Sequence, residues 1–237
     1  MRARIAGLLF VLSVLSLNSE ARPAPKTPAA TTPAAGVFLV ARRELLSPAF
    51  TRSVVLLLRH DERGTLGVIV NRRTRFRLHE LLPGLQDGRA AGHSVFIGGP
   101  VAPHALVMLM RREEPGAGIE RVTDEIAFST ERDVLEALIA RNKPSADLRF
   151  YIGHAGWAAG QLDAELARGS WYVIKATAEA VFGGDDEELW ERLIDRLDPP
   201  GIRVRRPGNG VASYGKDGGN TYGARGFCGR ASVVAAH

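Results

Sequence analysis

Short apolar runs bounded by turn-forming residues fill the middle of the chain and predict β-strands. Two of them, residues 53–58 and 65–70, are rich in Val, Ile and Leu and are separated by a loop that ends in Gly64. Because glycine readily adopts the left-handed conformation that closes such a loop, this pair predicts an antiparallel hairpin. Further strands are predicted at residues 37–41, 95–97, 106–110, 119–122, 126–128, 148–152 and 171–174.

Apolar positions with helical spacing predict several helices between these strands. Thr130 and Asp133 have the spacing of a capping box, which would open one of the helices. Residues 153–157 are expected to turn out of the preceding strand into another helix, and Gly169 is placed as the C-terminal cap of that helix. The helices are predicted over residues 78–85, 130–142, 158–168 and 185–197.

Strands at hairpin spacing with helices interspersed are typical of an α+β fold with a mostly antiparallel sheet. The strict alternation of strand and helix that builds a parallel sheet is absent from the pattern. The length of 237 residues also suits a single core. We therefore expect one compact α+β domain over residues 36–202.

The N-terminal residues have the layout of a secretory signal peptide. Arg2 and Arg4 precede a charge-free stretch over residues 5–17, and Ser19 and Ala21 occupy the −3 and −1 positions of a cleavage site. This layout predicts a signal peptide over residues 1–21. The apolar stretch is shorter than the roughly 20 residues of a spanning helix, so no membrane span is expected.

Two further segments differ in composition from the expected domain. Residues 22–35 are mainly Pro, Ala and Thr and predict an extended linker. Residues 203–237 are rich in Gly and polar, and they predict a disordered tail. Residues 201–237 hold six basic residues and one acidic residue, a net charge of +5, whereas residues 36–198 hold 21 basic and 24 acidic residues, a net charge of −3. The basic character of the chain therefore belongs to its ends.

No constellation of reactive side chains is recognisable in the sequence. The six histidines do not pair at zinc-binding spacing and Cys228 is the single cysteine, so neither a metal site nor a cofactor is expected. No Gly-x-Ser-x-Gly motif occurs, and no catalytic residue is predicted. A hydrolase-like enzyme whose site is assembled from distant residues stays an alternative. The run Arg72–Arg77, expected on an exposed loop, could contact phosphate, so a regulator associated with nucleic acid is another alternative.

Four longer motifs together resemble the YqgE/AlgH family. They are SVVLLLRH (residues 53–60), GTLGVIVN (64–71), VFIGGPV (95–101) and GHAGWAAGQLDAEL (153–166). The resemblance extends from about Gly36 to Ile202. It implies one compact α+β domain with bent, mostly antiparallel sheets flanked by helices. It also implies a biochemical role that is unsettled, with one branch linked to transcriptional control of exopolysaccharide synthesis.

The resemblance further implies where a shared binding surface would lie. This surface would be formed by Asn71, Gly98, Gly99, Pro100, Gly156, Trp157, Gln161 and Glu165. Each of these residues also has a purely structural explanation, as a turn glycine, a core tryptophan or a polar residue on a helix surface. The chain departs from the family at Arg59, Leu109 and His154, where Glu, His and Tyr are common.

These observations favour a non-enzymatic binding or regulatory protein that is periplasmic or secreted and acts on an unidentified protein partner. Relatives in the family are usually cytosolic, so a cytosolic regulator associated with nucleic acid or transcription control stays the alternative. The location of the chain decides between these two interpretations.

Overall fold

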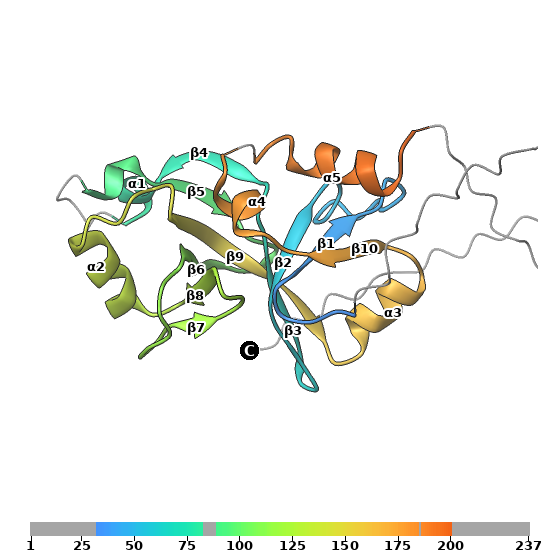
Figure 1. Ribbon diagram of the computed structural model, residues 1–237, viewed down its shortest axis with the longest axis horizontal. Helices are drawn as coiled ribbons and strands as arrows, with labels where there is room; N and C mark the ends of the chain where they lie inside the picture. Colours follow the sequence, from blue (N-terminus) through green and yellow to red (C-terminus); the bar gives the residue numbers. More distant parts are fainter. Residues whose placement is uncertain (1–31, 83–88, 185, 201–237) are drawn as a thin grey trace, which may run out of the picture. The chain divides into compact units, whose positions relative to one another are not determined.

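The computed structural model describes residues 32–82, 89–184 and 186–200 (Figure 1). The predicted signal peptide, most of the predicted linker and the predicted tail over 203–237 lie outside the described residues. Within the described part of the chain, no helix is both long enough and apolar enough to cross a membrane.

The described residues form strands and helices in the mixed order that the sequence predicts. The strands are β1 (Val37–Ala41), β2 (Val54–Asp61), β3 (Gly64–Ile69), β4 (Arg73–Arg77), β5 (Ser94–Ile97), β6 (Val101–Arg111), β7 (Glu120–Arg121), β8 (Ile126–Ser129), β9 (Leu148–Ala158) and β10 (Trp171–Lys175). The helices are α1 (Leu78–Leu81), α2 (Arg132–Ala140), α3 (Gln161–Ala167), α4 (Ala178–Phe182) and α5 (Leu189–Leu197), with a short 3₁₀ helix over Arg89–Gly92.

Strand β9 joins the two halves of the sheet, and Figure 1 shows it running from β6 to β3. Its first half pairs with β6 and β5, and its second half pairs with β3. The order of strands is β10-β1-β2-β3-β9-β6-β8-β7, with β5 and β4 branching from β9. Among the described strands, all pairs except β5–β9 are antiparallel. The predicted α+β fold with a mostly antiparallel sheet is confirmed.

The turn predicted at residues 153–157 is wrong, because these residues belong to β9. Gly153 has a φ of +69°, so the strand changes direction there without ending. A Cβ atom on Gly153 would lie 2.5 Å from the carbonyl oxygen of Gly99. Glycine is therefore required where two backbones approach this closely, and it does not prepare a helix N-terminus. Helix α3 begins only at Gln161.

The hairpin predicted before and after Gly64 is confirmed, but β2 continues to Asp61, beyond the predicted run 53–58, and β3 is shifted by one residue from the predicted 65–70. Asp61 pairs with Gly64, so Glu62 and Arg63 alone form the turn. Polar residues can continue the backbone hydrogen bonds of a hairpin, but they leave no apolar pattern in the sequence. The length of β2 was therefore underestimated.

The predicted helix ends had mixed outcomes. The capping box is wrong: the N-cap of α2 is Glu131, its side chain makes no capping bond, and its backbone N–H donates to the Ser129 hydroxyl at 3.0 Å. Gly169 adopts a φ of +74° just beyond α3, and its N–H donates to the carbonyl of Leu166 at 2.9 Å. This is the helix-ending role predicted for Gly169.

Apolar side chains form two buried clusters: the first and larger one includes every residue of β1, and the second includes the buried side chains of α2. On β9, Tyr151 belongs to one cluster and its neighbour Phe150 to the other, as alternation along a strand requires. The apolar stripe predicted on the last helix packs on the first cluster through Leu189, Trp190 and Ile194. Helix α4, which the sequence pattern did not predict, covers the same cluster.

Candidate functional site

The predicted residues Gly98, Gly99 and Pro100 connect β5 to β6 across the bend of β9. A Cβ atom on Gly98 would lie 2.3 Å from the carbonyl oxygen of Gly153. A Cβ atom on Gly99 would lie 2.2 Å from the carbonyl carbon and oxygen of His154. Both glycines are buried, while Pro100 is exposed. The two glycines therefore allow close backbone packing, and of the three residues only Pro100 faces solvent.

Asn71 lies next to this connection and is nearly buried. The N–H of Ile69, two residues before it, donates to the carbonyl of Gly98 at 2.8 Å. The Asn71 side chain points elsewhere: its Oδ1 accepts from the N–H of Val54 at 2.8 Å, and its Nδ2 donates to the carbonyl of Arg52 at 3.0 Å. Both ends of the amide are thus used to hold the start of β2.

The structure brings Trp157, Gln161 and Glu165 together at the far end of β9. Oε2 of Glu165 accepts from the indole N–H of Trp157 at 3.0 Å and from that of Trp171 at 2.9 Å. Its Oε1 accepts from Nε2 of Gln161 at 3.3 Å. The ring of Phe50 stacks on Trp157, with the ring centroids 5.6 Å apart. Glu165 therefore ties α3 to β9 and β10.

The predicted residues form two groups rather than one site. Gly98 and Gly99 pack against β9 at Gly153 and His154, whereas the Glu165 group surrounds the end of the strand. Gly156 lies between them with an exposed backbone. A binding role for these residues stays a prediction.

Buried titratable side chains lie on β9 and beside β5. Among the described residues, the Tyr151 hydroxyl and Nδ1 of His93 have no hydrogen-bond partner. Burial raises the pKa of Tyr151, and burial together with the charge of Arg149 lowers the pKa of His93. Burial also lowers the pKa of His154. Since loss of water disfavours the charged form of each group, these shifts favour neutral side chains near pH 7.

The run Arg72–Arg77 was expected on an exposed loop, but most of it forms β4. Arg73 donates to the buried carboxylate of Asp186 at 2.7 Å. Arg77 donates to the Ser94 hydroxyl at 2.8 Å. Arg72 donates to a backbone carbonyl at 3.1 Å, and burial lowers its pKa. The run is thus exposed as expected, since all residues of β4 except Thr74 are exposed, but it forms a strand, and three of its arginines also make hydrogen bonds within the fold.

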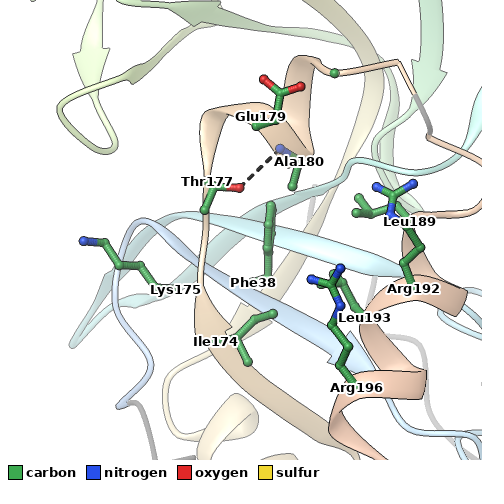
Figure 2. Close-up of a pocket in the computed structure, with 11 residues that line it drawn as sticks. Phe38, Ile174, Lys175, Thr177, Glu179, Ala180, Leu189, Arg192, Leu193 and Arg196 are labelled. Atoms are coloured by element: carbon green, nitrogen blue, oxygen red, sulfur yellow. Dashed lines mark hydrogen bonds between the residues drawn. The ribbon is translucent and has the colours of Figure 1, made fainter.

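A pocket of about 320 Å³ lies between the β1–β10 edge of the sheet and the last two helices (Figure 2). Its floor is apolar: Phe38 and Leu189 are each 1% exposed, and Figure 2 shows the Phe38 ring between α4 and α5. The lining residues are Phe38, Ile174, Lys175, Thr177, Glu179, Ala180, Gly183, Leu189, Arg192, Leu193 and Arg196.

The charged residues of the pocket are mainly basic. Arg192 and Arg196 lie one helical turn apart on α5, and both extend along the Phe38 side of the helix in Figure 2. Lys175 lies on the opposite side and points away from Phe38. Glu179 is the one acid in the lining, and its Oε2 accepts from the guanidinium of Arg111 at 3.0 Å. The pocket therefore combines an apolar floor with a surplus of positive charge.

Sequence reasoning missed this pocket because its lining comes from three separated segments, around Phe38, over residues 174–183 and over residues 189–196. One signal was available. Arg192 and Arg196 are spaced by four residues beside the apolar stripe of α5, which places two cations at the border of a buried face.

Among the described residues, no three His, Cys, Asp or Glu side chains lie close enough together to hold a metal ion.

The sequence of the folded body matches the AlgH-like family over residues 38–200. The chain belongs to the AlgH-like family. A UPF0301 protein of Myxococcus xanthus is 41% identical over 159 residues, which cover 66% of this chain and 86% of the relative. A UPF0301 protein of Chlorobium luteolum is 36% identical over 163 residues, which cover 68% and 84% of the two chains.

Two solved structures show the same fold. The solution structure of AlgH from Pseudomonas aeruginosa matches with a TM-score of 0.61 at 28% identity, covering 75% of this chain and 93% of AlgH. A crystal structure of a Corynebacterium diphtheriae protein matches with a TM-score of 0.60 at 26% identity, covering 72% and 90% of the two chains. The predicted AlgH resemblance and the single α+β domain are thus confirmed.

Proposed function

We propose that this member of the AlgH-like family is a non-enzymatic binding protein, and that the pocket between β10 and α5 is its ligand site. The observation that supports this proposal is the lining of the pocket, in which buried Phe38 and Leu189 lie beside the exposed cation of Arg196. Ligand sites typically combine apolar surface with a few convergent polar groups in about 300–1,000 Å³, and the volume of this pocket lies at the lower end of that range.

The positions of the polar residues that the sequence singled out support a binding role over a hydrolase. A general acid or base must exchange a proton with its substrate. Both oxygens of Glu165 accept hydrogen bonds within the fold, and both ends of the Asn71 amide are bonded to backbone. The internal contacts of Arg72, Arg73 and Arg77 likewise give less support to a nucleic-acid-associated regulator.

Binding in the pocket is tested with the neutral fluorescent probe N-phenyl-1-naphthylamine. Ala180 is half-buried in the pocket lining, so Ala180→Leu fills part of the cavity. We expect saturable binding to the unaltered protein and at least about tenfold weaker binding to Ala180→Leu. Ala164→Leu, the same change at an exposed position of α3, is the control and leaves binding unchanged. Equal binding by Ala180→Leu would place the ligand elsewhere, and no saturable binding of either this probe or octanoate would contradict the proposal.

The proposal that the protein is not an enzyme is tested with two general hydrolase substrates, p-nitrophenyl acetate and p-nitrophenyl phosphate. We expect the rates with the protein to equal those of buffer. Turnover that disappears in a folded Glu165→Gln or Asn71→Ala variant would instead support an enzyme assembled from these residues.

We also propose that the protein acts in the cell envelope. The proposal is supported by the charged, apolar and small-residue segments of residues 1–21. N-terminal sequencing of the protein from its own cells is expected to begin at Arg22. Recovery of the uncleaved chain from the cytosol would contradict export and favour the cytosolic alternative.

A further inference from the structure

We infer that the ligand of this pocket is a small, free amphipathic anion with an apolar body and one carboxylate or phosphate head. This inference rests on the proposed binding function and adds the chemical class of the ligand. It follows from the separation of charge and apolar surface within the lining, with cations on α5 and apolar side chains beneath them.

Arg196 supplies the contact for the anionic head. Its side chain is exposed at the pocket, and no carboxylate among the described residues pairs with it. The nearby acids of α5 have other partners: Asp195 pairs with Arg43 at 2.6 Å, and Glu191 pairs with Arg52. A guanidinium presents parallel N–H donors that match the two oxygens of a carboxylate or phosphate.

The apolar body of the ligand lies against the floor of the pocket. Ile174, Ala180 and Leu193 are half-buried and provide the apolar contact surface, while Phe38 and Leu189 are already buried beneath them. Removing apolar surface from water on both sides stabilises the complex by about 0.8 kcal/mol for each buried methylene, which is about fourfold in affinity. A volume near the lower end of the usual range suits a short chain or a single ring system.

Charge also argues against a ligand without a polar head. A wholly apolar ligand would remove water from the Arg196 guanidinium without replacing its hydrogen bonds, which costs binding energy.

The test compares octanoate and octyl phosphate with neutral 1-octanol, using amide chemical shifts of the full-length protein. We expect both anions to shift the signals of Ile174, Ala180 and Leu193, and to bind about tenfold more tightly than 1-octanol. Hexanoate is expected to bind more weakly than octanoate by about fourfold per methylene lost. Arg196→Gln should weaken octanoate binding about tenfold while leaving 1-octanol unchanged. Arg168→Gln, an exposed arginine at the end of α3, is the matched control and leaves both unchanged.

The outcomes separate the two levels of the proposal. Equal affinity for octanoate and 1-octanol, or octanoate binding that Arg196→Gln does not weaken, overturns the anionic class and leaves the pocket as a binding site. No shift at the three pocket amides with any probe overturns both the class and the proposed function. Sedimentation with vesicles of phosphatidylcholine and phosphatidylglycerol that requires Arg196 would overturn the assignment to a free molecule in favour of a membrane lipid.

Discussion

The buried carboxylate of Asp186 accepts two hydrogen bonds from the guanidinium of Arg73, at 3.2 Å from Nε and 2.7 Å from Nη2. Asp186 is 3% exposed and lies in the segment between α4 and α5, whereas Arg73 belongs to β4. The pair therefore joins the segment between the two pocket helices, α4 and α5, to a strand that lies more than a hundred residues earlier in the sequence.

Asp186→Asn is expected to destabilise the protein by about 2 to 4 kcal/mol, because it leaves the Arg73 guanidinium without its counter-charge in a partly buried place. Urea denaturation measures the change. Asp195→Asn removes the same charge from the solvent-exposed pair with Arg43 and should cost less than about 1 kcal/mol. Equal losses in the two variants would show that burial of Asp186 adds nothing.

Gly99→Ala is expected to destabilise the fold by about 3 kcal/mol or more, since the added methyl group would lie 2.2 Å from backbone atoms of His154. Backbone atoms cannot rotate aside as a side chain can. Gly156→Ala provides the comparison, because its methyl group would meet no heavy atom closer than 3.7 Å. Thermal unfolding should show a large loss for the first variant and little change for the second. A stable Gly99→Ala protein would refute the close crossing of this connection over β9.

Glu165→Ala is expected to cost about 2 to 4 kcal/mol, because two buried indole N–H groups lose their common acceptor. Glu165→Gln should cost less, since the amide retains one oxygen that can accept. Denaturation followed by tryptophan fluorescence reports both stability and the surroundings of Trp157 and Trp171. Asp163→Ala, at an exposed position of the same helix, is the control. If Glu165→Ala were no less stable than this control, the hydrogen bonds of Glu165 would have no structural role.

The side chain of Glu113 predicts a pH dependence of stability. Burial alone would raise its pKa, but the hydrogen bonds and charges of Lys143 and Arg141 lower it by more, so its pKa in the folded protein lies below 4.5. The unfolded chain then binds this proton more readily than the folded one. The stabilisation is fully present above about pH 4.5 and is lost as the pH falls through the folded-state pKa.

Comparison with Glu113→Gln isolates this contribution. At pH 6 the variant should be less stable than the unaltered protein by about 1 to 2 kcal/mol, and the difference should shrink toward pH 3. Glu114→Gln changes an adjacent but solvent-exposed carboxylate and should show no such convergence. A difference for Glu113→Gln that stays constant with pH would argue against the lowered pKa.

The sequence predicted most accurately those elements in which all the buried side chains are apolar. Residues 37–41 form the predicted strand without any change of bounds, because all five side chains are buried. The stripe of α5 was recognised for the same reason, although the helix begins at Leu189 instead of residue 185. Asp186, which lies within the helix predicted over residues 185–197, precedes α5 in the structure and is buried against Arg73.

By itself, the sequence determined the α+β class, the family and most strands, since burial of apolar side chains leaves a periodic pattern that can be read locally. Tertiary structure alone decided that β9 continues through Gly153, that Glu165 serves two tryptophans, and that a cationic pocket forms over Phe38. These features depend on close contacts between segments far apart in the chain. A local pattern indicates which side chains are buried, but it does not indicate which distant segment packs against them.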